Sequence, residues 1–168
     1  RHRFGCRVVC RLIEHSVIAS AELAQLLGEI LAEAEDLCRH SFGHYVMQAV
    51  LEHQPEYRGR IAQALCTDAR SNACNRCASH VVESVLAHCS NVELRELIWQ
   101  LLGSGMEGVV ALAQNQYGCF VLKALTKVPG RASEEALFHL THAAAHLGRT
   151  KYGSRLLHDL GFGAAPAA

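Results

Sequence analysis

The chain has 168 residues, of which half are hydrophobic and only 6% aromatic, and it contains 3 prolines. This composition, rich in Ala, Leu and Glu, favours an all-helical protein. Acidic and basic side chains number 16 each, and a net charge near zero argues against binding nucleic acid mainly through phosphate neutralisation. Any nucleic-acid role must therefore use base contacts or local basic patches, such as the arginines within residues 1–11.

The 8 cysteines form no compact framework of the kind found in secreted domains, and most of them lie in apolar helical patterns. We therefore expect reduced thiols and an intracellular, cytoplasmic protein. No apolar run is long enough to span a membrane. The sequence gives no reason to expect a cofactor or a metal.

In chain order, the sequence predicts helices over residues 4–15, 21–38, 42–53, 57–70, 77–89, 92–113, 116–126, 134–148 and 151–160. Ser90 and Glu93 form a capping-box pattern before the stretch 92–113. Ser133 is the predicted N-cap of the stretch 134–148. The segments "HQPEYRG" and "VPGRAS" carry the Pro and Gly that separate helices.

Five of these helices are similar to one another. They read "FGCRVVCRLIEH", "FGHYVMQAVLEH", "CASHVVESVLAHC", "QYGCFVLKALT" and "KYGSRLLHDL". Each has a small residue near its start, which we call the anchor, and the anchors are 38, 35, 40 and 35 residues apart. A period near 36 residues with helical content predicts a solenoid. The anchors are Gly5, Gly43, Ala78, Gly118 and Gly153.

The apolar residues of each copy lie on one stripe, which we expect to be buried. These residues are Val8, Val9, Leu12 and Ile13; Val46, Met47, Val50 and Leu51; Val81, Val82, Val85 and Leu86; Val121, Leu122 and Leu125; and Leu156, Leu157 and Leu160.

The opposite stripe of each copy presents three side chains that vary between copies, and we call each set a trio. The first and third members are four residues apart, so they project side by side. The trios are Cys6, Arg7, Cys10; His44, Tyr45, Gln48; Ser79, His80, Glu83; Cys119, Phe120, Lys123; and Ser154, Arg155, His158.

These five copies, from about residue 4 to residue 160, resemble the RNA-binding repeats of the Pumilio, or Puf, family. The resemblance implies a curved α-solenoid: a partial Puf domain over residues 1–160, with about four repeats and a terminal cap, followed by a disordered tail at 161–168. It further implies that single-stranded RNA lies on the concave face, one base per repeat and antiparallel to the chain. The first and third trio members then contact a base edge, and the middle member stacks between bases.

The trio of Ser79, His80 and Glu83 carries the clearest expectation. A carboxylate only accepts hydrogen bonds, and guanine offers two adjacent donors, so Glu83 with Ser79 predicts guanine while His80 stacks. Gln48 has both a donor and an acceptor, which suits uracil; His44 stands where the family's uracil readers usually carry Asn.

The remaining trios are less defined. Tyr45, Arg7 and Phe120 are the expected stacking residues of their repeats. Cys6 with Arg7 resembles the family's adenine reader, but Cys10 replaces its Gln. Lys123, beside Cys119, only donates and would suit a carbonyl-bearing base. The last trio is expected to belong to the cap.

The sequence also raises three alternatives to RNA binding. A zinc site at Cys74 and Cys77, with His80, His88 and Cys89 nearby, lacks a second close ligand pair, and no Cys–His pair has the third partner that an enzyme would need. The stronger alternative is a HEAT- or armadillo-like scaffold that binds proteins. The resemblance favours regulation of mRNA translation or decay through a 3′ untranslated region with a UGUA-like core, with protein co-regulators among the partners.

Overall fold

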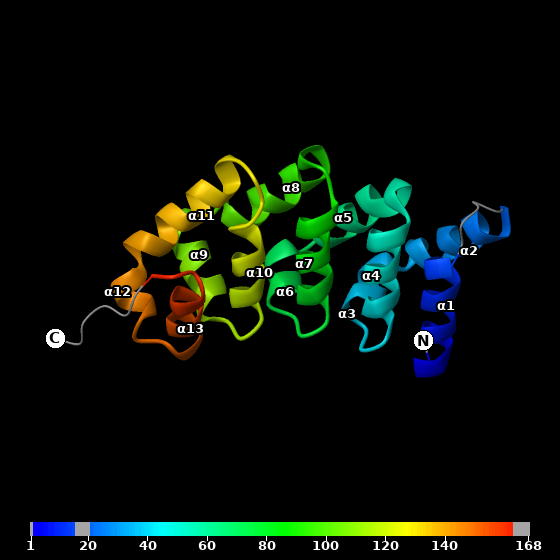
Figure 1. Cartoon of the computed structure of the whole chain (residues 1–168), viewed down its shortest axis with the longest axis horizontal. Helices are drawn as coiled ribbons and strands as arrows, with labels where there is room; N and C mark the ends of the chain where they lie inside the picture. The colour runs from blue at the N-terminus through cyan, green and yellow to red at the C-terminus, as the bar shows by residue number, and fades with distance from the viewer. Residues whose placement is uncertain (1, 16–20, 163–168) are drawn as a thin grey trace.

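The computed structural model describes residues 2–15 and 21–162, and over these residues it contains α-helices and one 3-10 helix but no strand. The helices stack side by side into an elongated, curved array, with α1 and α13 toward opposite ends of it (Figure 1). The expectation of an all-α solenoid is confirmed.

The array has three sets of helices. The front row, whose members pack in sequence against one another, consists of α1 (Arg3–His15), α4 (Gly43–His53), α7 (Ala78–His88), α10 (Gly118–Leu125) and α13 (Lys151–Asp159). The back row consists of α2 (Ala21–Ala32), α5 (Arg58–Cys66), α8 (Asn91–Leu102) and α11 (Arg131–His142). The link helices are α3 (Ala34–Arg39), α6 (Ala69–Ala73), α9 (Gly105–Gln114) and α12 (Ala144–Leu147), and η1 (Pro55–Tyr57) precedes α5.

The predicted apolar stripes form the core of most of the front row. All the stripe residues of α4, α7 and α10 are buried, whereas Leu160 after α13 is only partly buried. The expectation is wrong for α1, where Ile13 is buried but Val8 is 69% and Leu12 48% exposed. Helix α1 packs on α4, and Val8 and Leu12 lie on its solvent-exposed side.

Each predicted helix between two copies is in fact a pair, one back-row helix followed by one link helix. The stretch 92–113, for example, divides between Leu102 and Gly105, and Gly105 has a φ of +58°. A left-handed residue cannot continue an α-helix, so the chain changes direction there. The change allows each link helix to pack against the next front-row helix.

A side-chain acceptor three residues before the anchor caps the start of three front-row helices. Asn75 Oδ1 accepts the N–H groups of Cys77 and Ala78 at 2.9 and 3.1 Å. Asn115 and His40 make the same pair of contacts before α10 and α4. These bonds satisfy N–H groups that have no partner within the helix.

At Gly43 and Gly118 the anchor is small because another backbone lies against it. A Cβ on Gly118 would stand 2.7 Å from the carbonyl oxygen of Leu112, and one on Gly43 would stand 2.9 Å from that of Leu37. Both distances are shorter than a carbon–oxygen contact allows. These two glycines therefore set how closely α4 and α10 approach the link helices before them.

One predicted cap is present and one is wrong. Ser90 and Glu93 form the full capping box at the start of α8. Helix α11, however, begins at Arg131, directly after Gly130 with a φ of +114°. Ser133 lies inside its first turn, where its hydroxyl donates to the Gly130 carbonyl at 2.7 Å.

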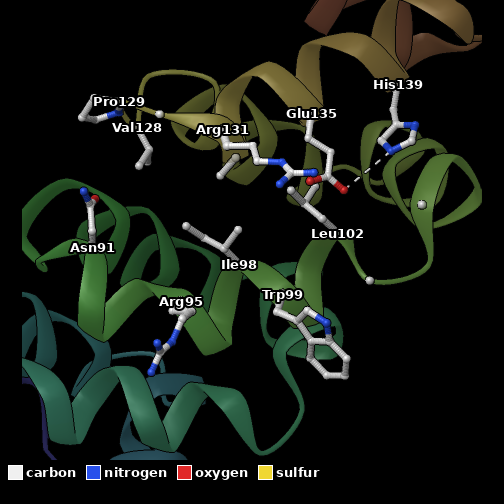
Figure 2. A pocket seen from close by; sticks show the side chains of 14 residues that line it. Asn91, Arg95, Ile98, Trp99, Leu102, Val128, Pro129, Arg131, Glu135 and His139 are labelled. Carbon is white, nitrogen blue, oxygen red and sulfur yellow. Dashed lines mark ion pairs between the residues drawn. The ribbon is translucent and has the colours of Figure 1, made fainter.

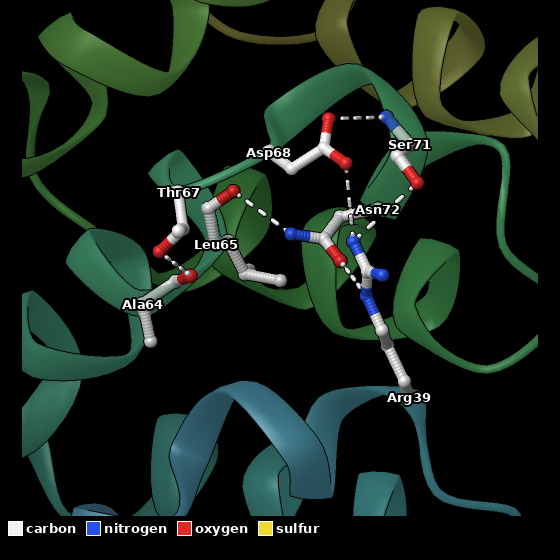
Figure 3. A network of polar contacts seen from close by, with 7 residues as sticks. All are labelled: Arg39, Ala64, Leu65, Thr67, Asp68, Ser71 and Asn72. Carbon is white, nitrogen blue, oxygen red and sulfur yellow. Dashed lines mark hydrogen bonds and ion pairs between the residues drawn. The ribbon is translucent and has the colours of Figure 1, made fainter.

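Polar contacts join consecutive link helices (Figure 3). Arg39 at the end of α3 donates to Asn72 Oδ1 at 2.8 Å and lies 3.5 Å from the Asp68 carboxylate. Asn72 in turn donates to the Leu65 carbonyl at 2.9 Å, and Asp68 Oδ1 accepts the Ser71 N–H at the start of α6. A buried amide with both ends bonded fixes the position of one repeat against the next.

Beyond α13, the Phe162 N–H donates to the Leu157 carbonyl at 3.0 Å, and the Phe162 ring packs on the core. Of the expected tail, residues 163–168 lie outside the described residues. Among the helices in residues 2–15 and 21–162, none combines the length and the apolar character needed to cross a membrane.

Candidate nucleic-acid interface

The three members of each trio lie at different depths on the front row. The second members Arg7, Tyr45 and His80 are exposed. The expectation that whole trios are exposed is wrong for the first members of α4, α7 and α10, whose exposed fractions are 5%, 1% and 4%. Because neighbouring front-row helices pack side by side, the first position of these three helices is covered. The covered residues are His44, Ser79 and Cys119.

Helix α7 presents a carboxylate at its third trio position. Glu83 is half-buried, and one of its oxygens lies 3.5 Å from His80 Nδ1. Burial raises the pKa of Glu83, while His80 and Lys127 act in the opposite direction. Among the described residues, no neighbour donates a hydrogen bond to this carboxylate. Its acceptor sites are therefore open to a ligand that carries two adjacent N–H donors.

On α4, His44 is buried and its Nδ1 lies 3.0 Å from the His40 carbonyl oxygen. Burial lowers the pKa of His44, so the neutral ring is favoured at neutral pH. The Tyr45 ring lies 3.9 Å from the His44 ring and is 56% exposed. Gln48 reaches toward α7, where its Nε2 donates to Ser84 Oγ at 3.0 Å.

A cavity of about 810 Å³ lies between α1 and α4. The lining residues include Cys6, Arg7, Cys10, Tyr45 and Gln48, so the trios of both helices open into one space. Burial and the neighbouring Cys6 raise the pKa of Cys10, which keeps this thiol protonated.

Helix α10 contributes a partly buried aromatic ring and a paired cation. The Arg155 guanidinium, from α13, lies 5.5 Å from the centre of the Phe120 ring. Lys123 Nζ lies 2.6 Å from Asp159 of the same helix α13. This ion pair lowers the pKa of Asp159. The Cys119 thiol donates to the Gln116 carbonyl at 3.5 Å rather than facing solvent.

A second cavity lies on the back row, and none of the predicted site residues line it. It measures about 980 Å³ and lies between α8 and α11. The apolar side chains of Ile98 and Leu102 line it together with the segment Val128–Pro129 (Figure 2). Trp99, which is 67% exposed, lies at its edge.

Within the part of the chain that the structure describes, no set of zinc ligands comes together around Cys74 and Cys77. All eight cysteines are free thiols, and burial raises the pKa of Cys38 and of Cys89 to about 12. Over the described residues, no three His, Cys, Asp or Glu side chains are grouped as metal ligands.

Sequence reasoning did not identify the contacts between consecutive trios. Gln48 bonds to Ser84 and Lys123 to Asp159, and in both pairs the residues are 36 positions apart. Each partner directly follows the third trio member of its own helix. A polar residue at that position is the signal that could have identified these contacts.

Comparison with known proteins places these features in one family. The model of the Pumilio-family RNA binding repeat matches residues 1–31, 34–66, 73–102 and 108–123. Pumilio homology domain family member 4 of Saccharomyces cerevisiae is 25% identical over 167 residues, which cover 93% of this chain and 18% of that protein. Pumilio homolog 12 of Arabidopsis thaliana is 29% identical over 126 residues, covering 74% of this chain and 20% of that protein.

Solved structures show the same fold. PUF-8 in complex with PBE-RNA superposes with a TM-score of 0.82 at 23% identity, over 95% of this chain and 47% of that one. The Puf4 RNA binding domain bound to the HO endonuclease RNA 3′ UTR recognition sequence gives a TM-score of 0.79 at 23% identity, over 93% and 49% of the two chains. The chain thus spans about half of these domains and about a fifth of its curated relatives. With the family model matched over more than half of its length, the chain belongs to the Pumilio family of RNA-binding repeat proteins.

Proposed function

We propose that this chain binds single-stranded RNA along the face formed by its front row, with one base per repeat, and that it contributes to regulation of mRNA translation or decay in the cytoplasm. The face is the concave side of the solenoid. Residues 1–160 act as one partial Puf domain that binds RNA and does not catalyse a reaction.

The arrangement of the front row supports this proposal. The second trio members place Arg7, Tyr45, His80 and Phe120 at equivalent positions on consecutive helices. Flat side chains at regular intervals suit successive bases, because every base has a π-face. The third members stand beside them and offer acceptors or donors to base edges.

The observation that carries the proposal is the open carboxylate of Glu83. It lies beside His80 at the groove between α7 and α10, and Lys123 and Lys127 line the same groove. A carboxylate beside lysines repels phosphate less than an isolated one, and it selects for guanine through the two donors of that base. Ser79 lies behind it, buried at 1% exposure, so Glu83 makes the main base contact.

A binding assay tests this function. Fluorescence anisotropy at one fixed salt concentration would compare a short RNA containing a G-U step with a scrambled RNA of the same composition. We expect tighter binding to the G-U RNA. Equal weak binding to both would contradict sequence-specific RNA recognition and favour the protein-scaffold alternative.

Two exposed aromatic residues make a matched pair for locating the RNA. Tyr45 is on the front row and is 56% exposed; Trp99 is on the back row and is 67% exposed. Tyr45→Ala should weaken RNA binding by about 1–3 kcal/mol with little change in base preference or in melting temperature. Trp99→Ala should leave the RNA affinity unchanged. If only Trp99→Ala weakened RNA binding, the RNA would lie on the back row and the proposal would be wrong.

A further inference from the structure

The Gln48 side chain crosses from α4 to α7 and ends in a small polar network. Its Nε2 donates to Ser84 Oγ at 3.0 Å and lies 3.4 Å from the His80 carbonyl oxygen. Ser84 Oγ donates to the same carbonyl at 3.0 Å. Two side chains from consecutive repeats therefore share the His80 carbonyl as acceptor.

The chemistry of this network sets the orientation of the Gln48 carboxamide. A carbonyl oxygen only accepts, so the Ser84 hydroxyl hydrogen points to His80 and its oxygen is left to accept. Only the NH₂ end of Gln48 meets both requirements. The reversed carboxamide would place Oε1 against the His80 carbonyl oxygen, and the Ser84 hydroxyl could donate to Oε1 only by giving up its own bond to that carbonyl.

This orientation determines what α4 offers to a base. Because Nε2 is held against α7, Oε1 is left as the acceptor of Gln48 that can meet a ligand, beside the second N–H of Nε2. His44 adds no donor, since its Nδ1–H is used on the His40 carbonyl. Uracil and guanine carry an N–H on the ring nitrogen of their Watson–Crick edge, whereas cytosine and adenine carry a lone pair there. Gln48 Oε1 would therefore face a donor on uracil or guanine, but an acceptor on cytosine or adenine.

The same contact recurs at the end of the row. Lys123 reaches from α10 to Asp159 on α13, across the same 36 positions. The corresponding partners of Cys10 and Glu83 would be Ala49 and Ala124, whose side chains have no polar atom. The third trio member is thus bonded to the next helix in α4 and α10, while the Glu83 carboxylate stays open.

We propose that Ser84 is a positioning residue that sets the base preference of the preceding repeat: by holding the Gln48 carboxamide, it makes the α4 site accept uracil or guanine and reject cytosine or adenine. This inference rests on the proposed RNA-binding function. It also refines the reason for expecting uracil at α4, because the contact with α7 fixes which way the Gln48 carboxamide faces.

The test uses four RNAs that differ only in the base directly 3′ of the guanine assigned to α7, measured against the wild type, Ser84→Ala and Ser84→Thr. The wild type should favour U and G over C and A by at least about fivefold. In Ser84→Ala only the 3.4 Å contact to the His80 carbonyl still holds the carboxamide, so it reverses more readily and the preference should fall to about twofold or less. Ser84→Thr keeps the hydroxyl and should keep the preference.

Control readouts separate orientation from stability. The guanine preference at α7 and the melting temperature should stay unchanged in Ser84→Ala. An equal loss of affinity for all four RNAs would show a merely structural role and overturn the inference. Full discrimination retained by Ser84→Ala, or a wild type that favours guanine at α7 but is indifferent at the next base, would also overturn it. Failure of the wild type to bind any of the RNAs would instead refute the proposed function.

Discussion

Replacing Glu83 by Gln tests base recognition, because it changes only one carboxylate oxygen into an NH₂ group. The carboxylate accepts two hydrogen bonds, whereas the carboxamide accepts one and donates the other. At one of the two contacts, an N–H of guanine would then face an N–H of the new Gln side chain. Adenine, with a ring acceptor beside an amine, would gain in relative terms.

The structure sets the expected size of the effect. An unmade contact in a buried site costs about 1–3 kcal/mol. The Glu83 side chain is 33% exposed, so water offsets part of this cost, and we expect the lower half of that range. The guanine-over-adenine preference should therefore fall by about 1–2 kcal/mol, or roughly 5- to 30-fold.

Competition anisotropy with RNAs that differ only at this base would measure the preference, at one fixed salt concentration. Glu96→Gln is the matched control, because it makes the same chemical change on the exposed face of the back-row helix α8. It should leave the preference intact. If the wild type does not favour guanine there, or if Glu83→Gln keeps the preference, the role assigned to Glu83 is wrong.

Acidification provides an independent check on the same residue. Burial raises the pKa of Glu83, so in the free protein this carboxylate gains a proton at a higher pH than an ordinary glutamate does. A protonated carboxyl carries a donor, which opposes guanine. The guanine preference of the wild type should decline as the pH falls toward the ordinary glutamate range, and Glu83→Gln should lack this decline.

Three further outcomes are expected. Burial lowers the pKa of His44 below its value in the unfolded chain. The free energy of unfolding therefore has its full value above about pH 6.5 and decreases as the pH falls, because the unfolded chain then takes up the proton more readily. In urea unfolding, His44→Asn should lose less of this free energy between pH 7.5 and pH 5.5 than the wild type does. Gly118→Ala should destabilise the fold by about 1–3 kcal/mol in urea, because its Cβ would lie 2.7 Å from a backbone oxygen, whereas Gly5→Ala, with nothing within 4 Å, should not. Asp159→Asn should weaken the contact that holds Lys123, and the dependence of log Kd on log salt should steepen by about 0.7.

The sequence was sufficient to predict the solenoid because its signal is periodic. The anchors and the apolar stripes recur with every copy, so each copy supports the others, and the buried residues of α4, α7 and α10 were identified correctly. The sequence did not reveal that each intervening stretch is two helices. The break after Thr67, for example, has neither Pro nor Gly, and it depends on Asp68 capping the next helix.

The sequence predicted which residue types form the site, but not how deeply each side chain is buried. The residue types of the trios follow from spacing, but spacing along one helix does not tell how closely the next helix packs. Ser79 was therefore expected on the surface and is buried, and Val8 was expected in the core and is exposed. Gln48 and Lys123 looked free because their partners, Ser84 and Asp159, lie 36 residues further along the chain.

The central claim is that RNA lies along the front row with its bases beside the second trio members. Photo-crosslinking tests it most directly: a G-U-containing RNA with 4-thiouracil at the base assigned to α4 would be irradiated on the protein, and the modified peptide identified by mass spectrometry. The account predicts a crosslink within α4 or α7, centred on Tyr45, that an excess of unmodified RNA abolishes. A crosslink at Trp99 on α8, or equal labelling of both rows, would contradict it.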